Sequence, residues 1–181
     1  GVYNFYKNII KFVPNSKIIL YNFSKLSGYA FTSELTKKLI NDFPKNIVGM
    51  KDSTGNLWDN LKVKNFSMFV GSEKKLLNGL KAGAAGCISA TTNVTGAIAR
   101  KVYDDFKKYG DSSEDAKLKS LRTVFDDTGN LISALHTFKS LENENYSNML
   151  PPLEILSEEK KSEMIRKLKD LNFINKNNRA A

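Results

Sequence analysis

The sequence has one cysteine and one histidine, and each scarcity limits the chemistry available to it. Cys87 has no partner within the chain, so an internal disulfide is excluded and a reducing cytoplasm is the expected location. Because Cys87 lies among small and apolar residues, a core thiol is favoured over a nucleophile. A lone histidine cannot build a zinc site, and the apolar residues around His136 favour a packing or surface role. We therefore expect no metal.

The sequence also lacks an apolar run long enough to cross a membrane, and its first residues do not resemble a secretory signal. Lysine and arginine number 28 against 19 aspartates and glutamates, which gives a net charge of +9. These basic residues are spread out and do not alternate with aromatics, so we expect neither nucleic acid nor a membrane as partner. Glycine-rich phosphate-binding motifs are absent too. A hydrophobic content of 41% over 181 residues indicates a soluble globular protein.

Four short apolar runs, each followed by a helical pattern, organise the chain. Alternation of this kind predicts an α/β fold with a parallel sheet and right-handed crossovers. The opening residues look like the end of an amphipathic helix, so we expect an amino-terminal part of a larger protein to precede them. Thr32 is a candidate N-cap for the first of the following helices. The predicted strands are 17–23, 46–51, 66–71 and 86–92, and the predicted helices are 32–43, 57–63, 73–82, 94–109, 113–141 and 157–171.

A lysine at the end of the second apolar run is the most informative residue. Ile47, Val48 and Met50 suit a strand that is covered on both faces, and Lys51 follows them directly. Polar residues 52–56 come next and read as the strand-to-helix loop, at the edge of the sheet where α/β folds bind ligands. A partly desolvated lysine there can lose its proton and attack a carbonyl carbon to form a Schiff base. The alternative is a lysine that snorkels at a strand edge.

Tyr21 ends the first apolar run as Lys51 ends the second. Neighbouring parallel strands lie about 4.8 Å apart, so side chains at matching ends can converge. A phenol beside a Schiff-base lysine can relay protons to and from the reacting carbon and the substrate hydroxyl. An ordinary strand-end tyrosine is the alternative. Strand alternation predicts that Ile47, Gly49 and Lys51 share one face, and that Ile19, Ile47 and Ile88 line an uncovered face of the sheet.

Several motifs together resemble the dihydrodipicolinate synthase / N-acetylneuraminate lyase family of pyruvate-dependent class I aldolases. The resemblance covers nearly the whole chain and rests on motifs that occur in the family's order, at residues 21–28, 49–56, 69–73, 83–89 and 149–159. It implies a (β/α)8 TIM barrel, of which this chain would supply about strands 5–8 and the C-terminal helices. The expected division is 1–112 for the partial barrel and 113–181 for a helical extension.

The resemblance also implies roles for individual residues. Lys51 would be the Schiff-base lysine, and Tyr21 the proton relay that contacts the substrate carboxylate. Ile88 would lie beside the bound keto acid and offer its backbone carbonyl. The positions that match contacts to the distal part of the substrate in the sugar-acid lyases are Ser53, Gly71 and Glu73. No cofactor is implied beyond the covalent lysine imine.

Departures from the family pattern bear on the substrate. Ser24 stands where a proline is common, and Leu26 stands where the synthases carry an arginine for a second carboxylate. Leu26 therefore favours a hydroxylated aldehyde over aspartate semialdehyde. Ala90 replaces a serine that the sialic-acid lyases use, which argues against sialic acid. The Gly-Thr-Thr-Gly-Glu segment that binds the pyruvate carboxylate in the family does not occur in the sequence, and neither does the tyrosine of strand four.

The resemblance therefore implies an aldolase-type lyase that joins or splits pyruvate and an aldehyde, with a 2-keto-3-deoxy sugar acid as the expected compound. One alternative is 4-hydroxy-tetrahydrodipicolinate synthase of lysine biosynthesis. The other is a non-catalytic half-barrel that binds a keto acid. We expect the full-length protein to be a homo-oligomer. We expect residues 1–181 alone to be inactive as an aldolase and either to self-associate or to aggregate, because open sheet edges and an uncovered apolar face favour pairing.

Overall fold

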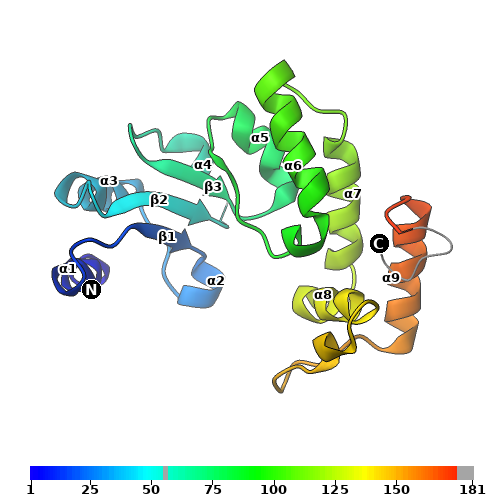
Figure 1. The fold of residues 1–181 in the computed structure, drawn as a ribbon. Coiled ribbons are helices and arrows are strands. Elements are labelled where there is room, and N and C mark those ends of the chain that lie inside the picture. Colours follow the sequence, from blue (N-terminus) through cyan, green and yellow to red (C-terminus); the bar gives the residue numbers. More distant parts are fainter. Residues whose placement is uncertain (55–56, 175–181) are drawn as a thin grey trace. The chain divides into compact units, whose positions relative to one another are not determined.

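The computed structural model describes residues 1–54 and 57–174 (Figure 1). The chain divides into two compact units, Gly1–Ile88 and Ser89–Ala181. The first unit contains a sheet with helices, and the described part of the second is built from helices. The predicted division at residues 112 and 113 stays a prediction, because a compact unit and a segment of a barrel are defined by different criteria.

The first unit alternates strands and helices, as the apolar runs predict. Its strands are parallel and adjacent in sequence order, β1-β2-β3-β4. Thr32 caps the third helix, because its hydroxyl accepts a hydrogen bond from the backbone N–H of Leu35 at 3.1 Å. The elements are α1 (Val2–Phe12), β1 (Ile18–Asn22), α2 (Ser24–Ser27), α3 (Ser33–Asp42), β2 (Ile47–Asp52), α4 (Leu57–Asn60), β3 (Ser67–Val70), the 3-10 turn η1 (Glu73–Lys75), α5 (Leu76–Lys81) and β4 (Gly86–Cys87).

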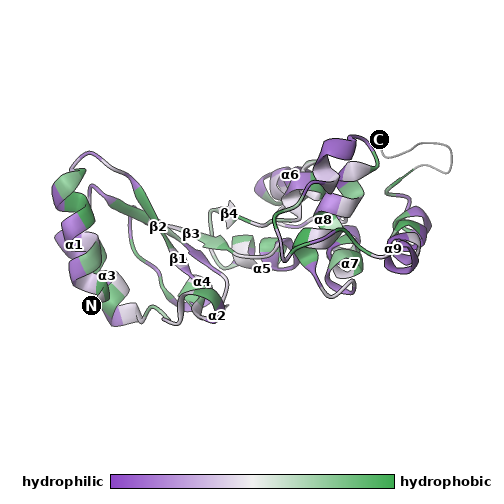
Figure 2. Cartoon of the chain, turned by 90° about the horizontal axis from the view of Figure 1, so that it is seen from below, coloured by the Kyte–Doolittle hydropathy of each residue, from purple (hydrophilic) through white to green (hydrophobic). Residues whose placement is uncertain are grey.

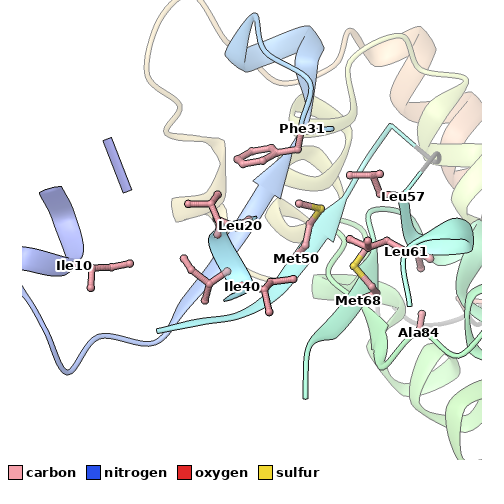
Figure 3. Close-up of a cluster of buried hydrophobic side chains, with 12 residues drawn as sticks. Ile10, Leu20, Phe31, Ile40, Met50, Leu57, Leu61, Met68 and Ala84 are labelled. Carbon is pink, nitrogen blue, oxygen red and sulfur yellow. The ribbon is translucent and has the colours of Figure 1, made fainter. Parts of the chain in front are cut away.

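The core of this unit lies on one face of the sheet (Figure 3). Side chains from alternate strand positions pack there against residues of the helices. The strands contribute Leu20, Met50, Met68 and Val70, and the helices contribute Ile10, Leu39, Ile40 and Leu57. Because successive side chains of a strand point to opposite faces, the residues between these positions belong to the other face. Tyr21 and Ile19 are accordingly 44% and 47% exposed.

The expected position of Ile47 on the open face is wrong. Ile47 is 1% exposed and belongs to the core. The cause is an irregularity in the pairing of β1 with β2: Ile18 pairs with Ile47 and Ile19 with Gly49. β2 thus has one more residue than β1 between these two pairs, and this register shift reverses the side-chain parity that simple alternation predicts. Ile88, which is 39% exposed, and Ile19 are solvent-exposed as predicted.

The described part of the second unit is helical and has its own core. Leu121, Phe125, Phe138, Met164 and Leu168 lie at its centre. Figure 2 shows hydrophobic and hydrophilic residues alternating along the helices, as expected where one side of a helix is buried. The elements are α6 (Thr92–Tyr109), α7 (Asp115–Asp126), α8 (Leu131–Ser140), the 3-10 turn η2 (Glu144–Ser147) and α9 (Glu158–Asp170).

Two predicted boundaries need correction. The single helix predicted over 113–141 is two helices, because Gly129 takes a left-handed φ of +86° and Asn130 starts a new helix. The Asn130 side chain accepts hydrogen bonds from the backbone N–H groups of Ile132 and Ser133. The fourth strand is Gly86–Cys87 alone, since residues from Thr92 onward are helical. Among the described residues, none of the helices combines the length and apolar character that crossing a bilayer requires.

Candidate active site

Tyr21 and Lys51 lie side by side at the ends of β1 and β2. They are register partners in the parallel pairing. The Lys51 Nζ atom lies 4.2 Å from the centroid of the Tyr21 ring, and the Phe23 ring lies 5.8 Å from Tyr21 on centroids. Both side chains belong to the face opposite the core, where Lys51 is half-buried and Tyr21 is exposed. The structure thus brings together an amine and a phenol on a partly open surface.

A buried pair of polar residues joins the ends of the same two strands. Asn22 and Asp52 are each 1% exposed, and Asn22 Nδ2 donates to Asp52 Oδ1 at 3.0 Å. Asn22 Nδ2 also approaches Thr54 Oγ1 at 3.2 Å, while Asn22 Oδ1 accepts from the backbone N–H of Phe31. A satisfied buried network of this kind favours one geometry, because breaking it would leave several polar atoms without partners. It fixes the backbone directly beside Tyr21 and Lys51.

Asp52 also holds the loop that follows β2. Its Oδ1 accepts from the backbone N–H of Thr54 at 3.0 Å. Its Oδ2 accepts from the backbone N–H groups of Leu57 at 2.7 Å and Trp58 at 3.0 Å, at the start of α4. A carboxylate at a helix start satisfies donors that the helix itself leaves open. Gly55 and Asn56, which belong to the quoted motif, lie outside the described residues.

Asn22 and Asp52 were not among the site residues predicted from the sequence. A signal was present in the sequence, because each of them follows an apolar residue, Leu20 or Met50, by two positions at the end of an apolar run. Alternation therefore placed two polar side chains in the core at adjacent strand ends. Buried polar groups in native proteins have hydrogen-bond partners, so a mutual contact was the expected solution. We interpret them as positioning residues.

Ser53 and Gly71 come together at the ends of β2 and β3. The backbone N–H of Ser53 donates to the Asn22 carbonyl, and that of Gly71 donates to the Asp52 carbonyl, each at 2.9 Å. A Cβ added at Gly71 would lie 2.8 Å from the Ser53 Cα and would also collide with the Ser53 hydroxyl. Gly71 is therefore required by the close approach of these two backbones. The backbone N–H of Ile88 similarly donates to the Val70 carbonyl at 3.0 Å.

Glu73 and Ile88 differ in accessibility, although the family resemblance implies that both contact the substrate. Glu73 is 0% exposed in η1, whereas Ile88 is 39% exposed after β4. The Glu73 charge acts on Cys87: burial, together with this carboxylate, raises the pKa of the Cys87 thiol to about 11. A thiol with such a pKa is almost entirely protonated at neutral pH, which disfavours a nucleophilic role for Cys87.

Metal-binding side chains do not assemble at these strand ends. Within residues 1–54 and 57–174, no three His, Cys, Asp or Glu side chains lie close enough together to hold a metal ion. The chemistry that the described arrangement can support is that of an amine nucleophile beside a phenolic proton donor and acceptor.

The chain is similar to known proteins of one family. The sequence model of the dihydrodipicolinate synthetase family matches residues 1–171. A 4-hydroxy-tetrahydrodipicolinate synthase of Wigglesworthia glossinidia brevipalpis is 33% identical over 99 residues, which are 52% of this chain and 32% of that protein. The chain spans less than half the length of the first curated relatives it matches.

Solved structures share the fold. The N-acetylneuraminate lyase of Fusobacterium nucleatum matches with a TM-score of 0.80 at 19% identity, over 94% of this chain and 60% of that one. A prophage protein of the dihydrodipicolinic acid synthase family from E. coli K12 was solved in complex with pyruvate. It matches with a TM-score of 0.75 at 24% identity, over 87% of this chain and 56% of that one. These structures are TIM barrels, so the α/β fold class and its assignment to this barrel family are confirmed.

Proposed function

Because the chain belongs to the dihydrodipicolinate synthetase family, we propose that it carries the imine-forming part of the active site of a pyruvate-dependent aldolase. The observation that carries the proposal is the pairing of Lys51 with Tyr21, with Nζ 4.2 Å from the ring centroid at adjacent strand ends. Parallel α/β sheets bind ligands at this edge. The pyruvate bound to the E. coli family member supports the same class of ligand here.

The proposed reaction begins with Lys51. Its neutral amine adds to the C2 carbonyl of a 2-keto acid, and loss of water leaves a protonated imine. The C3–C4 bond then breaks and its electron pair moves into the imine, which becomes an enamine. The C4 hydroxyl loses its proton and becomes a carbonyl, so the fragment that begins at C4 departs as an aldehyde. Protonation of the enamine at C3 and hydrolysis of the imine release pyruvate and restore Lys51.

Tyr21 is the proposed proton relay for these steps. Its phenol lies beside the amine that gains and loses protons, and it stays accessible because the residue is 44% exposed. The imine needs no metal as an electron sink, since its own positive charge accepts the electron pair. Asn22 and Asp52 position both groups through the backbone and do not act on the substrate.

We further propose that the aldehyde product is hydroxylated, so that the substrate is a 2-keto-3-deoxy sugar acid. Leu26 in α2 is 76% exposed and offers no charge to a second carboxylate. Ser53 offers a hydroxyl next to Gly71 at the neighbouring strand ends. The second candidate is 4-hydroxy-tetrahydrodipicolinate synthase, which the name of the Wigglesworthia relative favours. The third is a protein that binds a keto acid without turnover.

Borohydride trapping tests the imine. The full-length protein is incubated with pyruvate and sodium borohydride, and the modified peptide is identified by mass spectrometry. We expect the adduct on Lys51 in the wild type and none in Lys51→Arg, because a guanidinium stays protonated and cannot attack. Lys45→Arg is the matched control, because Lys45 lies just before the opposite end of β2. This variant should form the Lys51 adduct as the wild type does. Adduct on other lysines with Lys51 unmodified would exclude the mechanism, and trapping without turnover would favour the keto-acid-binding protein.

Substrate choice is tested by comparing kcat/KM for cleavage of a 2-keto-3-deoxy sugar acid with that for condensation of pyruvate and aspartate semialdehyde. We expect the wild type to prefer the sugar acid. Leu26→Arg should shift the ratio of kcat/KM values toward the semialdehyde by about tenfold. One charge-assisted hydrogen bond to a carboxylate changes a binding constant by about that factor. A wild type that prefers the semialdehyde would establish the synthase instead.

A further inference from the structure

The second unit contains a pocket of about 400 Å³ whose described lining includes neither Tyr21 nor Lys51. Its size falls within the range of sites that hold small molecules. Val94 of α6 and Ile132 and Leu135 of α8 form an apolar side. His136 and Lys139 of α8 and Tyr146 of η2 supply polar groups. An apolar wall with a few convergent polar groups is the usual composition of a small-molecule site.

The hydrogen bond of His136 defines which ring nitrogen a ligand can use. Its Nδ1 lies 2.8 Å from the backbone carbonyl of Tyr146, and a carbonyl only accepts, so Nδ1 carries a proton. In the neutral ring Nε2 is then the acceptor, and no partner for it is seen within the described part of the chain. The imidazole also meets the Tyr146 ring edge-on at 6.2 Å between centroids. These contacts fix the orientation of a hydrogen-bond acceptor in the pocket wall.

Lys139 supplies a positive charge to the same pocket. A hydrogen bond and the charge of Glu142, 2.8 Å away, raise the pKa of Lys139, so the amine is protonated at neutral pH. An ammonium has three donors, and the bond to Glu142 uses one of them. The side chain is 31% exposed, which leaves it within reach of solvent and solutes. None of the described lining residues is an aspartate or glutamate.

We propose that this pocket binds a small hydroxylated monocarboxylate with a compact apolar body. The carboxylate pairs with Lys139, and the hydroxyl donates to Nε2 of His136. The apolar body packs against Val94, Ile132 and Leu135. A dianion is disfavoured because the pocket offers one cation, and that cation is already shared with Glu142.

The probe is mandelate, which carries a carboxylate, a hydroxyl and a phenyl ring. It has no ketone, so it cannot form an imine with Lys51. Binding to the full-length protein is measured by calorimetry and by the NMR shift of the His136 imidazole, assigned as the signal missing in His136→Gln. We expect saturable one-site binding and a shift of that signal. Lys139→Met should weaken binding about tenfold, as expected for loss of a charge-assisted hydrogen bond, whereas Glu142→Gln should strengthen it.

A control variant and two analogues of mandelate separate the effects of ligand charge and ligand shape from a general effect on the fold. Lys161→Met is the control variant, because Lys161 pairs with Glu158 at the same i,i+3 spacing in α9 and does not line the pocket. It should bind mandelate as the wild type does. Mandelamide, which lacks the charge, and lactate, which lacks the ring, should each bind more weakly than mandelate. Absence of saturable binding, an unmoved His136 signal, or equal affinities for wild type and Lys139→Met would each overturn the proposal. Pyruvate trapping at Lys51 should be unchanged in Lys139→Met, so the two proposals fail independently.

Discussion

The side-chain amide of Asn22 donates a hydrogen bond to the buried carboxylate of Asp52, and this contact joins the last residues of β1 and β2. Each of these residues directly follows one member of the Tyr21–Lys51 pair. The contact therefore sets the backbone from which the amine and the phenol project on the opposite face. A site of this kind depends on residues that never touch the substrate, because small displacements of reacting groups are costly.

Replacing Asn22 by alanine should lower the free energy of unfolding by about 2 kcal/mol, because Asp52 and the N–H of Phe31 each lose a buried partner. The measurement is urea unfolding monitored by circular dichroism. Asn41→Ala, at an exposed position of α3, serves as the control and should leave the free energy of unfolding unchanged. Equal stabilities of Asn22→Ala and Asn41→Ala would show that the buried contact contributes little.

Tyr21→Phe should separate imine formation from proton transfer. Phenylalanine keeps the ring beside the Lys51 amine but removes the hydroxyl, so borohydride trapping should persist while kcat falls about 100-fold. Tyr29→Phe is the matched control: Tyr29 is also partly exposed and meets the Phe31 ring edge-on, so the loss of its hydroxyl should leave kcat unchanged. Unchanged kcat in Tyr21→Phe would contradict the assigned relay.

A methyl group at Gly71 should destabilise the fold, since the added carbon would lie 2.8 Å from the Ser53 Cα. Overpacking of this kind costs about 1–3 kcal/mol, which thermal unfolding can detect. Gly96→Ala in α6 is the contrasting variant, because nothing lies within 4 Å of its added carbon. It should stabilise the protein by up to about 1 kcal/mol through the better helix propensity of alanine. Equal effects of the two substitutions would argue against a close approach at Gly71.

Alkylation of Cys87 should be slow at neutral pH and should accelerate until about pH 11. Burial and the Glu73 carboxylate both favour the neutral thiol, so the folded protein holds little thiolate below the pKa of about 11. The rate is measured with iodoacetamide by mass spectrometry of the Cys87 peptide. Glu73→Gln should shift the pH profile downward, because it removes one of the two causes, and denaturant should restore ordinary reactivity. A rate that levels off near the ordinary thiol pKa of about 8.5 would contradict the assignment.

The sequence by itself determined the alternation of strands and helices in the first unit, although it did not predict the short helix α2. Short apolar runs placed β1, β2 and β3 to within a residue or two, and Thr32 marked the start of α3 through its capping hydroxyl. The pairing of Tyr21 with Lys51 also followed from the sequence, because parallel strands of similar length end at one edge. Their catalytic roles come from the family resemblance and remain to be tested.

Tertiary structure alone decided the features that depend on distant contacts. Ile47 lies on the core face because the pairing of β2 with β1 shifts register by one residue after it, and no local pattern predicts where a neighbouring strand shifts. The partners of Asp52 come from β1 and from the loop and helix after β2, so its capping role required the folded chain. The pocket around His136 likewise exists only where α6, α8 and η2 pack together, because side chains distant in sequence define its walls.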